Sequence, residues 1–212
     1  MKFAVLGASG RTGRPLLDQA LAKGHSVTAL VRTPSAFDLE HPRLTVVPGD
    51  ALDADAVART VEGADVVLLT LGQVKGSPPD LMERAAENVV AAMRQHGVRR
   101  VITETGAGVA RPGDPEGFGP SFMRGVMGLV AGALLRDSVA HVDVLAASGL
   151  DWTAVRAPRL TNGPRTGAYR TGLFAMGPGH SVSRADVADY MLRLATSDEG
   201  VGEAPMITAK AA

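Results

Sequence analysis

The chain has 212 residues, of which 45% are hydrophobic and 21% charged, and its 22 basic residues balance its 22 acidic ones. This composition is typical of one globular domain, and the lack of a basic excess argues against non-specific nucleic-acid binding. Cysteine is absent, which excludes a disulfide framework, a thiolate metal site and a cysteine nucleophile.

The apolar run at the N-terminus is too short for a signal peptide, and Arg11 and Arg14 follow it at once. The longest uncharged apolar stretch, residues 126–135, is too short to span a bilayer. We therefore expect a cytoplasmic protein without a membrane partner.

Strand and helix patterns alternate along the whole chain. The predicted strands are 2–6, 26–31, 44–47, 65–70, 100–104 and 152–156, with a short last strand near 205–208. The predicted helices are 12–23, 54–61, 79–96, 138–148 and 184–196, and Ser183 with Asp186 forms a capping box before the last. Strands separated by helices pair in parallel through right-handed crossovers. We predict an α/β fold: one Rossmann-type domain over residues 1–212, with a doubly wound parallel sheet in three α/β/α layers.

The first strand leads directly into the sequence Gly7-Ala8-Ser9-Gly10-Arg11-Thr12-Gly13, which a helix follows. In this position Gly7 allows a sharp turn, Gly10 lets the backbone approach phosphate, and Gly13 lets the helix pack close to the strand. The N–H groups and the dipole at the start of the helix favour an anion. The motif predicts a site for the pyrophosphate of a dinucleotide, formed by all seven residues.

The end of the second strand discriminates between dinucleotides. A carboxylate about 20 residues after the glycine motif would hold the ribose 2′-hydroxyl, but Arg32 stands there instead. A guanidinium can pair with a 2′-phosphate and stack on adenine, so we favour NADP(H) over NAD. Asp50 and Ala51, after the third strand, are expected beside adenine, or Asp50 caps a helix. Leu71 and Gly72, after the fourth strand, are expected near the ribose and nicotinamide.

Residues 106–135 interrupt the alternation. Residues 106–122 contain five glycines and three prolines, and 123–135 have the pattern of an apolar helix. Two interpretations remain open for this segment. It is either a lid-like or subunit-contact element beside the site, or an ordinary core helix.

The usual proton-delivery pair of short-chain dehydrogenases, a tyrosine followed four residues later by a lysine, is missing. The chain has two tyrosines, Tyr169 and Tyr190, and leucine stands four residues after each. An acceptor that tolerates its own reduced anion, such as a flavin or another conjugated system, needs no strong acid from the protein. The cofactor then carries the chemistry and the protein positions it.

Several motifs along the chain together resemble the atypical short-chain reductases with an NAD(P)H-binding, NmrA-like fold, and especially the group of flavin and biliverdin-IXβ reductases. They lie at residues 7–13, 31–32, 49–50, 148–158, 166–169, 177–178, 181–187 and 190–193. The resemblance covers nearly the whole chain. It implies NADPH-dependent reduction of a flavin, a quinone or a related conjugated acceptor.

The resemblance also implies roles for residues at the far end of the cofactor. Thr105 matches a serine beside the nicotinamide, and Pro158 and Arg159 match a segment along the cofactor. Arg159 stands where the mammalian flavin reductase has a histidine, and Val142 replaces a second one, so simple flavin or quinone reduction is favoured over tetrapyrrole reduction. Glu104 ends the fifth strand, where burial would favour its protonated form, and the alternative for it is a salt bridge with one of the arginines. Thr105, Glu104 and Arg159 are the candidate catalytic residues.

His141 has two interpretations, a proton donor to the acceptor or an exposed or half-buried helix residue. Its neighbours Asp137 and Asp143 are expected mainly on a solvated helix face. No cluster of side chains has the spacing of metal ligands.

Two other functions remain as alternatives: an NmrA-like redox sensor that binds dinucleotide without catalysis, and an epimerase-like enzyme on the same scaffold. A small-molecule acceptor is the expected partner, nucleic acid is not, and the chain is expected to be a monomer or a homodimer.

Overall fold

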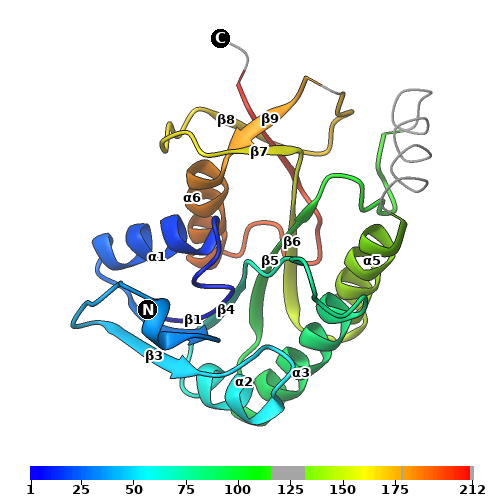
Figure 1. Ribbon diagram of the computed structural model, residues 1–212. Helices are drawn as coiled ribbons and strands as arrows, with labels where there is room; N and C mark the ends of the chain where they lie inside the picture. Colours follow the sequence, from blue (N-terminus) through cyan, green and yellow to red (C-terminus); the bar gives the residue numbers. More distant parts are fainter. Residues whose placement is uncertain (116–131, 178, 211–212) are drawn as a thin grey trace.

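The computed structural model describes residues 1–115, 132–177 and 179–210. Its main sheet has the strand order β3-β2-β1-β4-β5-β6-β10-β8 (Figure 1). These strands are β1 (Lys2–Leu6), β2 (Ser26–Val31), β3 (Leu44–Pro48), β4 (Val66–Leu69), β5 (Arg100–Gly106), β6 (Asp151–Ala157), β8 (Tyr169–Gly172) and β10 (Met206–Ala209). All neighbours pair in parallel except β8 and β10, which are antiparallel. The order of the first six strands is that of a Rossmann fold, so the predicted fold class is confirmed.

Helices cover both faces of this sheet (Figure 1). The helices α1 (Gly13–Ala22) and α6 (Arg184–Ala195) pack against each other on one face. On the other face lie α2 (Ala54–Val61), α3 (Leu81–His96) and α5 (Gly132–Ala147), with α3 between the other two. A short 3-10 turn, η1 (Pro34–Ala36), follows β2. The described helices are too short or too polar to cross a membrane.

The central strands are buried on both faces, as parallel strands between two helical layers must be. In β1, Phe3 and Val5 belong to the core beneath α1 and α6, whereas Ala4 and Leu6 belong to the core beneath α2 and α3. All four residues of β4 are buried. Its unbroken run of valine and leucine is typical of a strand that is buried on both faces.

The structure adds three short strands that the sequence did not predict. β7 (Arg159–Thr161) and β9 (Ser181–Ser183) form a separate parallel pair, and β8 forms the antiparallel edge of the main sheet. Each has only three or four residues, too few to show a period. Of the predicted apolar helix over 123–135, residues 132–135 belong to α5, and the rest lies outside the described residues.

Two buried polar side chains of α5, Asp137 and His141, hold this helix against the start of α3. The Asp137 carboxylate accepts hydrogen bonds from the backbone N–H groups of Met82 and Glu83, both at 3.0 Å, and from the Gln73 amide at 2.6 Å. The Asp80 side chain, at the N-cap of α3, makes no capping bond. Asp137 therefore supplies the cap of α3 from a neighbouring helix. Asp137 is thus buried rather than on a solvated face.

Removing the Asp137 carboxylate would leave these buried donors without an acceptor. We therefore predict that Asp137→Ala lowers the free energy of unfolding by about 2 to 4 kcal/mol, measured by urea denaturation. The matched control is Asp143→Ala on the same helix, which removes only an exposed ion pair with Arg111 and is expected to cost less than about 1 kcal/mol. Equal losses in the two variants would show that the cap on α3 contributes little.

Candidate functional site

The turn after β1 lies so close to neighbouring backbone that only glycine fits at its critical positions. Gly7 has φ of +85°, and a Cβ added there would lie 2.6 Å from the backbone of Thr70 at the end of β4. A Cβ on Gly13 would lie 2.1 Å from the carbonyl oxygen of Gly7. The turn therefore presents bare backbone and the start of α1 at the carboxyl edge of the sheet, which is the geometry that a pyrophosphate requires. These residues fit a dinucleotide.

A first cavity lies beside this turn, between the ends of β1, β2, β3 and β4. Its walls include eight of the predicted cofactor-binding positions: Gly7, Ser9, Gly10, Arg32, Asp50, Ala51, Leu71 and Gly72. The Arg32 side chain is 64% exposed, and its Nε lies 3.9 Å from an Asp50 carboxylate oxygen. Such an exposed ion pair is weak, so an incoming phosphate can replace it. Asp50 also accepts the backbone N–H of Leu52 at 2.9 Å and so shapes the loop after β3.

A second cavity, of about 410 Å³, lies at the ends of β5 and β6 and is bounded by α3 and α5. Thr70, Leu71, Gly72, Val74 and Gly10 line both cavities, so the two adjoin along the glycine-rich turn. Glu104, Thr105 and Pro158 line the second cavity, as do Arg11 and Thr12. Ala8 and Gly13, by contrast, are buried inside the turn.

Glu104 is the titratable carboxyl group of the second cavity. Burial raises its pKa from 4.5 to about 7, and this outweighs the opposing effects of the Thr12 hydroxyl and the Arg184 charge. The hydroxyl of Thr12 donates a hydrogen bond of 3.3 Å to Glu104, which links the start of α1 to the end of β5. Near neutral pH this carboxyl group can therefore either hold or release a proton.

The loop after β5 is fastened to β6 by a buried ion pair. The guanidinium of Arg156 donates to both carboxylate oxygens of Asp114, at 2.6 and 2.7 Å, and also to the backbone carbonyls of Val109 and Ala204. Arg156 is fully buried. Since Gly106, Gly108 and Val109 line the second cavity, this pair fixes one of its walls.

His141 is fully buried, so neither the exposed nor the half-buried position expected from sequence is right. Its Nδ1 lies 2.9 Å from the carbonyl oxygen of Met82 and its Nε2 lies 2.7 Å from the Thr103 hydroxyl. A carbonyl only accepts, so Nδ1 carries the proton and Nε2 accepts from Thr103. Burial lowers the His141 pKa, which keeps the ring neutral. His141 holds α5 against α3 and β5 and does not line the cavity.

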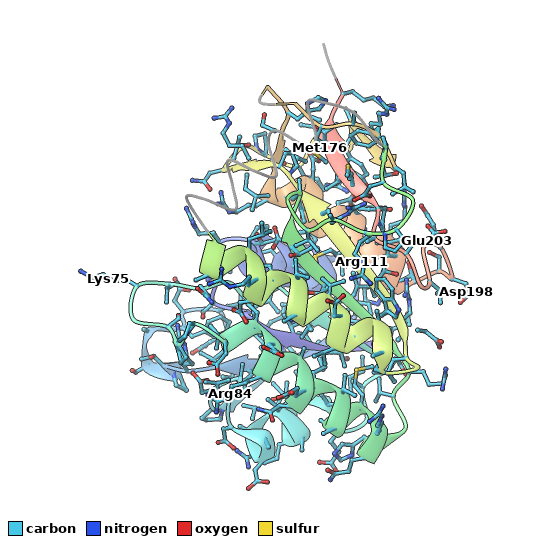
Figure 2. All side chains as sticks on the ribbon, turned by 90° about the vertical axis from the view of Figure 1, so that its right-hand side faces the viewer. Lys75, Arg84, Arg111, Met176, Asp198 and Glu203 are labelled. Atoms are coloured by element: carbon cyan, nitrogen blue, oxygen red, sulfur yellow. The ribbon has the colours of Figure 1, made fainter. Side chains whose placement is uncertain are left out.

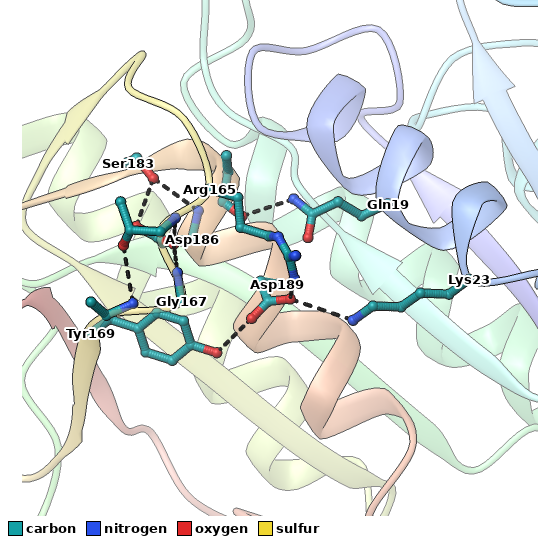
Figure 3. A network of polar contacts seen from close by, with 11 residues as sticks. Gln19, Lys23, Arg165, Gly167, Tyr169, Ser183, Asp186 and Asp189 are labelled. Carbon is teal, nitrogen blue, oxygen red and sulfur yellow. Dashed lines mark hydrogen bonds and ion pairs between the residues drawn. The ribbon is translucent and has the colours of Figure 1, made fainter.

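Arg159 and three other polar side chains lie away from the second cavity. Arg159 is exposed on β7 and is not among the residues that line it. Lys75 is exposed and points into solvent from the loop after β4, whereas Arg111 lies beside α5 (Figure 2). Tyr169 donates its hydroxyl hydrogen to Asp189 at the contact between α1 and α6 (Figure 3).

Sequence reasoning missed Arg184, Met82 and Ser138, which line the second cavity. Arg184 was read only as part of the helix start after Ser183. The Ser183 half of the predicted capping box is confirmed, because Ser183 accepts from the backbone N–H of Asp186 at 3.0 Å. The Asp186 carboxylate instead accepts from the backbone N–H groups of Thr166 and Gly167. That Arg184 also lines the second cavity follows only from where the start of α6 lies in three dimensions.

The raised pKa of Glu104 predicts a specific dependence of stability on pH. The folded protein binds this proton more tightly than the unfolded chain, so the group is most favourable to folding below about pH 4.5 and costs stability as pH rises to about 7. Glu104→Gln should remove about 1 to 3 kcal/mol of the stability difference between pH 5 and pH 8 in urea denaturation. Glu203→Gln, at an exposed glutamate, is the control. If the free energy of unfolding of Glu104→Gln depended on pH as that of the unmodified protein does, the raised pKa of Glu104 would be contradicted.

The chain is similar to several known proteins. A protein 36% identical over 127 residues is the 3-diazoavenalumate denitrifying reductase of a Streptomyces species, and the match covers 54% of this chain and 41% of that protein. The chain thus spans about two fifths of the length of this relative.

Two solved structures cover nearly the whole chain. One is ChuY, an anaerobillin reductase from Escherichia coli O157:H7, with a TM-score of 0.81, 24% identity and full coverage of both chains. The other is a Rossmann-fold NAD(P)-binding family protein from Shigella flexneri, with a TM-score of 0.73 and 25% identity, covering 98% of this chain and 93% of that one. A family model described as NAD(P)H-binding matches residues 7–198. The chain therefore belongs to the NAD(P)H-binding family.

Proposed function

We propose that this protein is an NADPH-dependent reductase that transfers hydride to a flavin, a quinone or a similar conjugated acceptor. The observation that carries the proposal is the pair of adjoining cavities. One has the residues for the adenosine end of a dinucleotide, and the other is lined mainly by apolar side chains with Glu104 and Thr105 at the sheet edge. When bound, NADPH supplies the hydride. Two similar proteins are themselves named as reductases, which supports the reaction class.

The environment of the tyrosines supports an acceptor that needs no tyrosine acid. Burial and the neighbouring Asp189 carboxylate raise the pKa of Tyr169, which is the opposite of what a catalytic tyrosine needs. Tyr190 is buried, and burial raises its pKa too. Of the described residues that line the second cavity, none is a tyrosine or a lysine.

Within this proposal, the residues of the second cavity have different roles. Thr105 lines the cavity, and only 8% of its surface is exposed. Its hydroxyl orients the nicotinamide carboxamide or the acceptor. Protonated Glu104 supplies a proton to the acceptor after reduction. The apolar walls from Val109, Leu134 and Leu160 exclude water and bind the conjugated ring system. Arg159 is placed outside these walls and would need the acceptor to extend toward β7.

Turnover tests the proposal directly. NADPH oxidation is followed by absorbance with FMN, FAD and small quinones as acceptors, and at least one acceptor is expected to be reduced. Because Glu104 acts in its protonated form, kcat should fall as pH rises through about 7, and Glu104→Gln should lose this pH dependence together with about 10- to 100-fold in kcat. Tight NADPH binding without turnover of any acceptor would contradict the proposal and favour a redox sensor.

The preference for NADPH is proposed to come from Arg32. The unmodified protein should bind NADPH about 10-fold or more tightly than NADH in titration calorimetry, since a guanidinium pairs strongly with a 2′-phosphate. Arg32→Ala should remove this preference by weakening NADPH alone. Arg59→Ala, at an exposed arginine on α2, should leave both dissociation constants unchanged. Equal binding of the two cofactors by the unmodified protein would overturn this role.

A further inference from the structure

Arg184, the first residue of α6, is a buried arginine on the wall of the second cavity. Only 9% of its surface is exposed, and it lines the cavity together with Glu104 and Arg11. Its Nη1 donates a hydrogen bond of 2.7 Å to the side-chain oxygen of Asn162, just after β7. Across the described ranges, no carboxylate oxygen lies within 4.0 Å of this guanidinium.

A buried guanidinium without a carboxylate partner is unusual. Arginine is almost never buried unless it is paired, because removing its charge from water is costly. Its side chain has five N–H donors in a rigid planar fork, and the bond to Asn162 uses one nitrogen and fixes the direction of the others. By contrast, the buried Arg156 nearby is fully matched by Asp114 and two backbone carbonyls. Arg184 has donors left for a ligand.

The charges around Arg184 leave the cavity positive. Burial and the like charge of Arg11 lower the Arg184 pKa, and Glu104 opposes them only weakly. Glu104 is itself partly protonated near neutral pH and bonded to Thr12. Among the described residues that line the cavity, the two guanidiniums therefore face at most one carboxylate. A ligand with an acidic group would restore the balance.

We propose that Arg184 forms an anion-binding subsite of the acceptor cavity, so that the acceptor is a conjugated molecule bearing a carboxylate or phosphate. This inference rests on the proposed reductase function and specifies its substrate class. The pyrophosphate of the cofactor is already matched by the glycine-rich turn and the start of α1. Arg184 lines the acceptor cavity beside Glu104 and Arg11, and the bond to Asn162, just after β7, fixes the direction of its side chain. The apolar walls bind the ring while Arg184 binds the acidic group and so fixes which way the ring faces.

Riboflavin and FMN test this subsite, because they share one ring system and differ by a phosphate. Their binding to the protein saturated with NADP⁺ is measured by flavin fluorescence. The unmodified protein should bind FMN about 10-fold or more tightly than riboflavin. Arg184→Gln should weaken FMN about 10-fold or more, leave riboflavin within about 2-fold, and leave the Kd of NADP⁺ unchanged. Arg184→Lys should keep part of the preference, since it keeps the charge without the fork.

The control variant is Arg193→Gln, which removes an exposed arginine from the same helix and should change neither flavin. Thermal melting of both glutamine variants shows whether α6 still packs, and Arg184→Lys tests the charge if Arg184→Gln unfolds. No preference for FMN in the unmodified protein, an equal loss for both flavins, or a loss confined to NADP⁺ would each overturn the subsite. Because binding needs no turnover, a protein that selects FMN through Arg184 but oxidises no NADPH would refute the reductase function and leave the subsite standing.

Discussion

The site depends on the contact between the backbone of the turn after β1 and the backbone at the end of β4. Thr70 donates its N–H to Leu6 at 2.9 Å, and its hydroxyl lies 3.2 Å from the carbonyl oxygens of both Leu6 and Gly7. This contact leaves no room for a side chain at Gly7, and the carbonyl oxygen of Gly7 leaves none at Gly13. It places the start of α1 at the point where the chain crosses from β3 back to β4, beside β1. Both cavities meet at that point, so the contact between the turn after β1 and the end of β4 determines their relative position.

Buried polar groups then determine the shape and charge of the second cavity. Asp137 and His141 fix α5 to the start of α3, and the pair of Arg156 with Asp114 fixes the loop after β5 to β6. All of these groups are matched by partners, as burial requires. Glu104 and Arg184 are matched incompletely, and both line the cavity. Glu104 and Arg184 thus keep bonding capacity that a ligand in the second cavity would use.

The sequence predicted most of the fold because its signals were local. The alternating strand and helix patterns and the helix start at Ser183 located the long elements to within a few residues, except at the start of α5. Eight predicted cofactor positions line the first cavity, because consecutive parallel strands bring their carboxyl ends to one edge. What the sequence could not show are contacts between distant segments. The burial of His141 and Asp137 depends on how α5 meets α3, and the exposure of Arg184 to the cavity depends on where α6 begins relative to β5. The roles of Thr105, Glu104 and Arg159 stay predictions.

In the proposed function, one extended dinucleotide runs from Arg32 past the glycine-rich turn to Glu104 and Thr105. A crystal structure of the protein with NADP⁺ measures this most directly. The account predicts the 2′-phosphate at Arg32, the pyrophosphate on the backbone of Gly10 to Thr12, and the nicotinamide ring in the second cavity beside Thr105. A nicotinamide ring outside that cavity, or the adenosine end bound within it, would contradict the account.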